Sequence, residues 1–133
     1  TLTKVGLEEN IIWLGHIKYE DMQIYYNACD VVVSVPSSDS SPKSVYEAMF
    51  CGKPVVISDL EWSHEVLDEL ECVYRIEVRN ASQLCDGIIR LISDAKFLEK
   101  ITKNSLKIAH KYFDYKANMS KMESIMYDIV KKH

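Results

Sequence analysis

The stretch "VVVSVPSSDSSPKSVYEAMFCGKPVVISD" (residues 31–59) contains two apolar runs that flank one helical pattern. The runs at 31–36 and 54–59 are rich in β-branched residues and show no alternation with polar residues. Runs of this kind are typical of strands covered on both faces, as in a parallel sheet flanked by helices. The stretch therefore predicts two buried strands of one parallel sheet, with a helix between them.

Residues 42–51 predict that helix, and the residues at its two ends favour it. Ser41 can act as the N-cap, and Pro42 suits the first helical position, where no N–H group is needed. Gly52 suits the position just after the helix, and Pro54 lies beyond it. We expect a well-bounded helix of about ten residues.

The alternation of strand and helix continues on both sides of this stretch. Further strands are predicted at 10–15 and, with weaker alternation, at 72–78. Helical patterns occur at 20–29, 62–70, 82–93, 95–112 and 114–131. The order predicts an α/β fold, a Rossmann-like parallel sheet flanked by helices, followed by two C-terminal helices with no strand between them. We expect residues 1–133 to form a single domain, with the last two helices packed across the sheet or onto a neighbouring part of the protein.

Composition excludes several classes of protein. The 133 residues are 47% apolar and 27% charged, which is typical of a globular domain, and the net charge of −4 lacks the basic surplus of nucleic-acid binders. No apolar run approaches the roughly 20 residues of a membrane span. The four cysteines form no Cys-x-x-Cys pair and lie in apolar settings. We therefore expect no metal site, and free thiols of a reduced, cytoplasmic protein.

The predicted helix at 42–51 has a narrow polar strip, formed by Lys43, Ser44 and Glu47, and Asp39 lies in the loop before it. In an open α/β sheet, ligands bind beyond the carboxyl ends of the strands, and a helix N-terminus there suits a phosphate group. The two carboxylates suit hydroxyl groups, so the combination favours a sugar phosphate or a nucleotide sugar. The alternative is structural, because Lys43 and Glu47 also suit a solvated i, i+4 pair and a Ser/Asp loop often caps a helix.

Residues 34–59 resemble the signature of the group 1 glycosyltransferases, retaining enzymes of the GT-B architecture. The family pattern has two acids separated by seven residues, then Ala-Met, a small pair, Gly, any residue and Pro-Val. The matching residues are Asp39, Glu47, Ala48, Met49, Cys51, Gly52, Pro54 and Val55. Segments 9–33, 63–67 and 111–130 are similar to flanking parts of the family, so the resemblance covers nearly the whole chain.

The resemblance implies transfer of a sugar from a nucleotide-sugar donor to an acceptor with retention of configuration. In this family Glu47 would bind the ribose hydroxyls of the nucleotide, and Asp39 would contact the transferred sugar. Both acids are thus candidate catalytic residues. The nucleotide sugar is a substrate, and no further cofactor or metal is expected.

The resemblance implies further donor-binding residues around these two acids. Backbone amides of the turn at Ser40, Ser41 and Lys43, with Ser44 beside them, would meet the sugar and the diphosphate. Residues 15–16, Gly15 and His16, would lie near the nucleotide base.

The resemblance also implies that the chain is the latter part of a C-terminal donor-binding domain. The family's basic residues that neutralise the leaving diphosphate lie in earlier strands, so we expect the isolated chain to be inactive. The acceptor, a sugar or a glycolipid, would be bound by an N-terminal domain outside these residues.

Two departures from the family pattern keep other functions open. The family usually has Glu at the position of Asp39 and Gly at the position of Ser40. The alternative is a non-catalytic nucleotide-sugar-binding or assembly module, and a nucleotide-sugar epimerase fits the signature less well.

Two other features lie outside the signature. His64 beside Glu65 would suit acid–base chemistry, but no third partner is evident in the sequence. Lysines recur on one face of the helix predicted at 95–112, at positions 96, 100, 103, 107 and 111. Such a face is usually solvated, and the alternative is peripheral contact with an anionic membrane surface or a lipid-phosphate acceptor.

Overall fold

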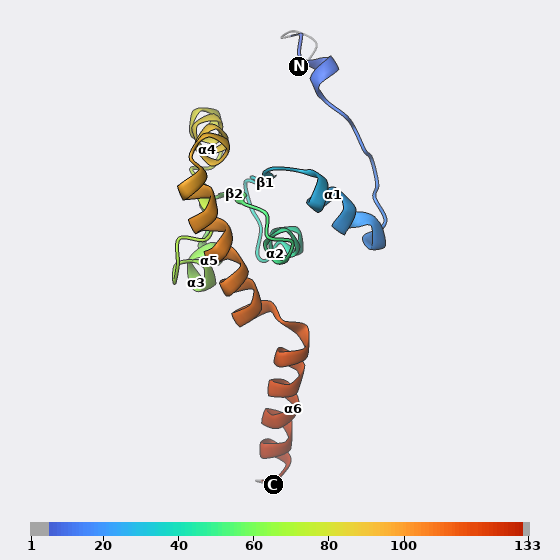
Figure 1. Cartoon of the computed structure of the whole chain (residues 1–133). Coiled ribbons are helices and arrows are strands. Elements are labelled where there is room, and N and C mark those ends of the chain that lie inside the picture. Colours follow the sequence, from blue (N-terminus) through green and yellow to red (C-terminus); the bar gives the residue numbers. More distant parts are fainter. Residues whose placement is uncertain (1–5, 132–133) are drawn as a thin grey trace.

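The computed structural model describes residues 6–131, and a three-stranded parallel sheet lies at its centre (Figure 1). The strands are β1 (Val32–Ser34), β2 (Val55–Ser58) and β3 (Tyr74–Ile76), in the order β1-β2-β3. Val33, Val56 and Tyr74 lie side by side across the three strands. The predicted α/β fold with a parallel sheet flanked by helices is confirmed.

Six α-helices and two short 3-10 helices complete the described part of the chain. Their bounds are Glu8–Asn10 and Tyr19–Asp21 (3-10), α1 Met22–Ala28, α2 Lys43–Phe50, α3 Glu61–Leu67, α4 Ala81–Ser93, α5 Ala95–Phe113 and α6 Tyr115–Lys131. Every predicted helix is therefore present, with ends shifted by a few residues. No helix in the described residues is both long and apolar enough to cross a membrane.

The central strand feeds two hydrophobic cores because successive side chains of a strand point to opposite faces. Val55 and Ile57 lie in the first core, together with Met49 of α2, and all three are fully buried. Val56 lies in the second core, with Leu91 of α4. The prediction of a strand covered on both faces is confirmed for β2.

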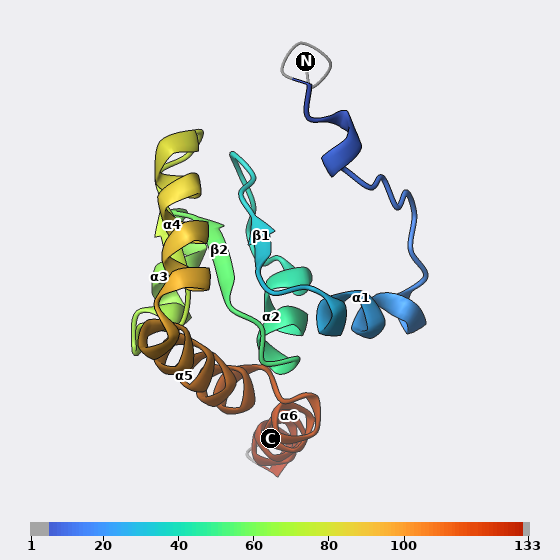
Figure 2. The same cartoon turned by 45° about the horizontal axis from the view of Figure 1, so that its top comes forward.

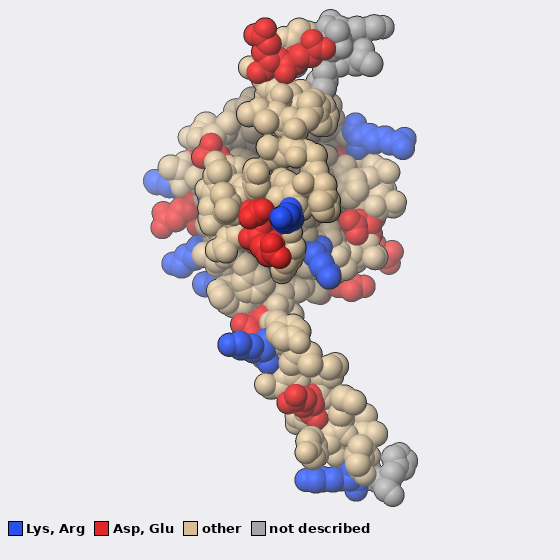
Figure 3. Space-filling model, turned by 90° about the vertical axis from the view of Figure 1, so that its right-hand side faces the viewer, with Lys and Arg blue, Asp and Glu red and all other residues tan. Residues whose placement is uncertain are grey.

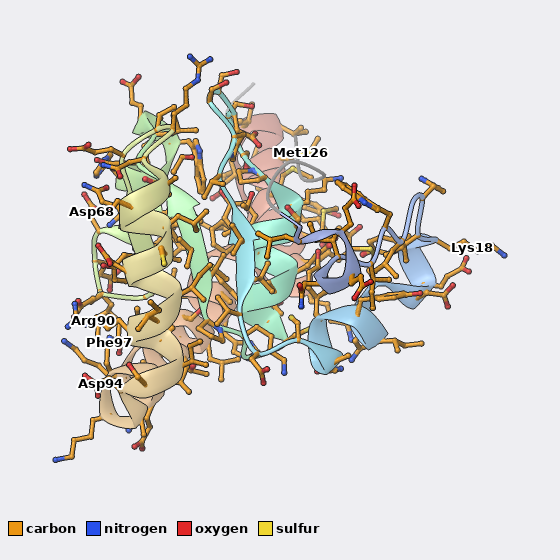
Figure 4. All side chains as sticks on the ribbon, turned by 90° about the horizontal axis from the view of Figure 1, so that it is seen from above. Lys18, Asp68, Arg90, Asp94, Phe97 and Met126 are labelled. Atoms are coloured by element: carbon orange, nitrogen blue, oxygen red, sulfur yellow. The ribbon has the colours of Figure 1, made fainter. Side chains whose placement is uncertain are left out.

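Helix α5 joins the two cores. Ile101 from its first half packs in the second core, and Ile108 from its second half packs in the first. Figures 1 and 2 show α5 running past the sheet from α4 toward α6. Where α4 meets α5, the Arg90 guanidinium lies 3.8 Å from the centre of the Phe97 ring, and Figure 4 shows both residues beside Asp94. The Asp94 carboxylate caps α5 by accepting a hydrogen bond from the Phe97 N–H group.

Strand β1 departs from the prediction, because it is not covered on both faces. The Val33 side chain is 42% exposed, and within residues 6–131 the strand pairs only with β2. The strand predicted from the β-branched run is confirmed, but the apolar composition of the run does not establish what covers it.

The prediction of a strand at 10–15 is wrong. Asn10 ends a 3-10 helix, residues 11–15 form no strand, and Ile12 and Trp13 are 83% and 82% exposed. A strand needs a neighbour for its backbone N–H and C=O groups, and among the described residues this segment has none. Figure 1 shows it running outside the sheet and away from β1.

The start of α2 also differs from the prediction, whereas its end agrees. The helix begins at Lys43, and Pro42 rather than Ser41 occupies the N-cap position, with no side-chain cap. At the other end, Gly52 has φ +67°, its N–H group binds the Met49 carbonyl, and the Lys53 N–H group binds the Ala48 carbonyl. This pair of bonds is a Schellman motif, which a left-handed glycine after the helix allows.

Helix α6 does not pack across the sheet. None of its residues is buried, and Met126 and Ile129 are more than half exposed. Figure 3 shows it projecting from the body of the molecule, with mostly uncharged side chains on the face seen there.

The cysteines are free, but not all of them lie in apolar settings as expected. Cys72 is fully buried, Cys29 and Cys51 are half-buried, and Cys85 is exposed on α4. Burial raises the pKa of the Cys72 thiol to about 11, so this thiol stays protonated near neutral pH.

Candidate functional site

The candidate site lies where the loop after β1 enters α2. This loop leaves the carboxyl end of β1, so Asp39, Ser40 and Ser41 lie at the edge of the sheet where ligands of α/β proteins bind. All three residues are exposed. The loop and the first two turns of α2 together contain most of the predicted site residues.

Asp39 is folded back onto its own loop. Its Oδ1 atom accepts hydrogen bonds from the backbone N–H groups of Ser40, at 2.7 Å, and Ser41, at 3.2 Å. An aspartate that binds the backbone one and two residues ahead stabilises a turn. The carboxylate therefore orders the loop, through one of its two oxygens.

The first turn of α2 presents backbone N–H groups that no side chain caps. The Ser41 hydroxyl, which could have capped them, donates instead to the Tyr46 hydroxyl at 3.3 Å. Tyr46 in turn stacks on Phe113, with ring centres 3.7 Å apart. Unpaired N–H groups and the positive end of the helix dipole make this turn suitable for an anion.

Glu47 lies on the second turn of α2 and is half-buried. Its Oε2 atom accepts a hydrogen bond from the Tyr26 hydroxyl of α1 at 3.1 Å. In the described part of the chain no ion pair joins Glu47 to Lys43, so the i, i+4 pair that the sequence allowed is not formed.

Glu47 lines two neighbouring cavities. The first, of about 420 Å³, lies between α1 and α2 and is also lined by Tyr19, Gln23 and Tyr26. The second, of about 460 Å³, is shared with Lys43 and with residues of α6, such as Asn118. The carboxylate is thus at the junction of α1, α2 and α6.

Gly15 and His16 lie apart from this junction. Gly15 has φ +65°, in the left-handed region that favours glycine, and both residues are exposed and line neither cavity beside Glu47. The structure therefore brings together Lys43 and Glu47 but does not bring residues 15–16 to them. Among the described residues before α1, Tyr19 is the one that lines both cavities.

Tyr26 and the residues of α6 belong to the site but were not predicted from the sequence. Tyr26 was visible only as one apolar position of a predicted helix. Its partner lies 21 residues away, and no local pattern links two positions at that distance. Two adjacent tyrosines at 25–26, one of which had to face the core, were the available signal.

His64 has partners that the sequence did not reveal. Its Nε2 atom lies 2.7 Å from Asp59, and its Nδ1 atom lies 2.9 Å from Asp68. Arg75 binds the other oxygen of Asp68. The hydrogen bond to Asp68 raises the pKa of His64, with a smaller contribution from Asp59, and the same bond lowers the pKa of Asp68. This cluster surrounds His64 of α3, and none of its residues lines either cavity beside Glu47.

The lysine face of α5 is divided between two environments. Lys100 pairs with Glu71 and Lys111 pairs with Glu69. Lys103 and Lys107 instead line an open, largely apolar groove of about 940 Å³ near the start of β2.

Within residues 6–131, no group of His, Cys, Asp and Glu side chains could hold a metal ion.

Fold and site together define an α/β protein with a parallel sheet and a polar site at the carboxyl end of its strands. The family described as "Glycosyl transferases group 1" matches residues 2–108, and the chain belongs to this family. The likeness stated from the signature at 34–59 is confirmed at the level of the family.

Individual relatives agree with this assignment. One relative is the N,N'-diacetylbacillosaminyl-diphospho-undecaprenol alpha-1,3-N-acetylgalactosaminyltransferase of Campylobacter jejuni. The two sequences are 32% identical over 84 residues, which are 63% of this chain and 22% of the relative. Across the curated relatives it matches, the chain spans about a fifth to a third of their length.

Solved structures share the fold over most of the chain. Anabaena HepE in complex with UDP-glucose matches 96% of this chain and 35% of its own, with a TM-score of 0.85 and 24% identity. The C-terminal domain of a group 1 glycosyl transferase, LpcC, from Francisella tularensis matches 86% of this chain and 59% of its own, with a TM-score of 0.74 and 25% identity.

Proposed function

We propose that the chain is the nucleotide-sugar-binding part of a retaining glycosyltransferase of the GT-B architecture. It would form the latter part of a C-terminal domain, residues 1–133, within a longer enzyme. The observation that carries the proposal is the position of Glu47, a half-buried carboxylate lining two cavities one turn beyond an uncapped helix N-terminus. Hydroxyl groups suit the carboxylate and a diphosphate suits the N–H groups, and a nucleotide sugar carries both.

In this proposal each residue near α2 has a separate role. Glu47 accepts hydrogen bonds from the ribose hydroxyls, and Asp39 contacts the transferred sugar. The backbone amides at Ser40, Ser41 and Lys43, with Ser44, meet the sugar and the diphosphate. The Lys43 ammonium adds positive charge beside the leaving group, which stabilises the charge that develops there.

Gly15 and His16 lie outside both cavities in the structure. Their proposed contact with the nucleotide base therefore requires the segment before α1 to move toward the donor. The left-handed backbone at Gly15 is consistent with a turn that can be held close to a ligand.

The reaction would exchange one bond to the anomeric carbon of the donor for another. The bond from that carbon to the diphosphate oxygen breaks, and a bond to the acceptor hydroxyl oxygen forms on the same face. The electron pair leaves with the nucleoside diphosphate, and the acceptor hydroxyl gives its proton to the departing diphosphate oxygen. The residues supply binding and charge stabilisation without a further cofactor or metal.

The test compares Glu47→Gln and Asp39→Asn in the complete enzyme, with exposed Glu61→Gln as control. UDP and UDP-glucose are the first probes, because HepE is in complex with UDP-glucose. We expect Glu47→Gln to weaken UDP binding about tenfold, since a hydrogen bond to a charged group contributes about 1.5 kcal/mol or more. Asp39→Asn should leave UDP binding unchanged and lower the rate of sugar transfer.

Two results would contradict the proposed donor binding and retaining mechanism. One is wild-type binding and transfer in both variants. The other is a product whose anomeric configuration, read by NMR, is inverted relative to the donor. Sugar transfer by the isolated 133 residues would contradict the proposal that this chain is only one part of the active enzyme.

The proposal also covers where the acceptor binds and how the enzyme contacts a membrane. An acceptor sugar or glycolipid would bind to an N-terminal domain, with the enzyme in the cytoplasm and peripheral at an anionic membrane. Lys103 and Lys107 are the lysines of the 96–111 face that line an open groove rather than pairing with Glu69 or Glu71. Vesicle binding that survives the double change Lys103→Glu and Lys107→Glu would exclude them as the membrane contact.

A further inference from the structure

Tyr26 connects α1 to the candidate site through one hydrogen bond. Its hydroxyl donates to Oε2 of Glu47 at 3.1 Å. Tyr26 as a whole is 7% exposed and packs in the first core, with Val45 and Met49 of α2. The phenol is therefore fixed by packing at its ring end and by the carboxylate at its polar end.

This phenol is a constant donor. Burial and the neighbouring Glu47 together raise the pKa of Tyr26 to about 12, with burial as the larger cause. The hydroxyl thus carries its proton near neutral pH. A buried tyrosine hydroxyl needs a partner, and here the partner is a carboxylate of the site.

The bond leaves Glu47 suited to a second partner. A carboxylate has two oxygens and about four acceptor positions, and Tyr26 occupies one of them on Oε2. A neutral donor also leaves the full negative charge on the carboxylate, which an ammonium partner would offset. Lys43, one turn earlier, forms no ion pair with Glu47 among the described residues.

We propose that Tyr26 is the positioning residue of Glu47, and that it holds Oε2 so that the carboxylate is already oriented to accept the ribose hydroxyls of the donor. This inference rests on the function proposed for Glu47. A glutamate side chain that is free to rotate loses conformational entropy when it binds, and one that is already held loses less. In this proposal Tyr26 acts through the Glu47 carboxylate, because its hydroxyl already donates to Oε2.

The test is a double-mutant cycle in the complete enzyme with a ligand that lacks the hydroxyl groups. Tyr26→Phe keeps the ring and removes only the hydroxyl. UDP and 2′,3′-dideoxy-UDP are titrated by calorimetry against the wild type, Tyr26→Phe, Glu47→Gln and the double variant. GDP and its dideoxy analogue replace them if the wild type binds GDP more tightly. Tyr25→Phe, on the same helix but 40% exposed, is the matched control.

We expect Tyr26→Phe to weaken binding of UDP about fivefold and to leave binding of the dideoxy analogue unchanged. In the Glu47→Gln background, Tyr26→Phe should cause no further loss, because the carboxylate through which it acts is gone. The Tyr25→Phe control should bind both ligands as the wild type does.

The other outcomes separate the two proposals. Equal weakening of both ligands by Tyr26→Phe overturns the positioning role, because it shows a general structural effect. Wild-type binding in Tyr26→Phe, with weakened binding in Glu47→Gln, overturns the positioning role and leaves the role of Glu47 standing. Wild-type UDP binding in Glu47→Gln overturns the proposed function itself.

Discussion

At the scale of single residues, His64 shows most directly how the fold changes a side chain's chemistry. Its two ring nitrogens lie between Asp59, directly after β2, and Asp68, one turn further along the chain. Arg75 from β3 binds the far side of Asp68, and Glu61 and Glu65 also belong to the His64 segment. The imidazole is thus held between two carboxylates while remaining about half exposed.

The pKa of His64 should lie above the ordinary value of 6.5 in the folded protein. Because the folded-state pKa is raised, the protonated histidine stabilises the fold fully below pH 6.5, and this contribution is lost as pH rises through the raised value. The Asp68 pKa is lowered, so its contribution is present above the ordinary carboxyl value and is lost at more acidic pH.

An NMR titration of the His64 ring protons measures this directly. We expect Asp68→Asn to lower the midpoint more than Asp59→Asn does, because the bond to Asp68 is the larger cause. Glu65→Gln is the control on the same helix. A midpoint at or below 6.5 in the wild type would contradict the structure at this point.

At the scale of elements, α2 determines the geometry of the site. Its buried face is formed by Val45, Ala48 and Met49. That burial fixes the rotation of the helix, and Glu47 is thereby directed toward α1 and α6. The C-terminal end of α2 is fixed by the Schellman motif at Gly52.

Gly52→Ala should lower the free energy of unfolding by about 1–2 kcal/mol. The cause is the left-handed backbone at φ +67°, since an added Cβ would meet the Leu106 side chain at an ordinary 3.7 Å. Gly52→Asn should cost less, because asparagine tolerates this conformation better than alanine. Urea unfolding of the three proteins measures the difference, and equal stability of the alanine variant and the wild type would contradict this account.

At the scale of the whole molecule, α5 holds the two hydrophobic cores together. Its first half packs beside α4 and its second half packs beside α2. Because each core uses one face of β2, a loss of packing on α5 weakens the sheet from both sides. Helix α6, which follows it, has no buried residue.

Ile101→Ala should therefore lower the free energy of unfolding by about 3 kcal/mol, as expected for a cavity in a closely packed core. The matched control is Ile92→Ala on α4, where the side chain is 62% exposed and the change should stay within about 0.5 kcal/mol. Chemical denaturation followed by circular dichroism tests both. A similar effect of the two changes would show that Ile101 is not in a tight core.

The sequence alone determined the strand–helix–strand unit from β1 to β2, and the position of Asp39 and Glu47 around the start of α2. These features are local: β-branched runs, a glycine after a helix and a helical apolar stripe follow from neighbouring residues. The group 1 signature lies within the same stretch, so the family was also readable there.

Only the tertiary structure decided which of these elements are covered and which side chains meet. The run at 10–15 has the composition of a strand but, within residues 6–131, no neighbour with which to pair. Val33 of β1 is exposed, although the sequence of β1 resembles that of the buried strand β2. The hydrogen bond between Tyr26 and Glu47 joins two helices, and the two residues are 21 positions apart in the chain. Pairing and burial depend on residues that are distant in the chain, and short-range patterns carry no information about them.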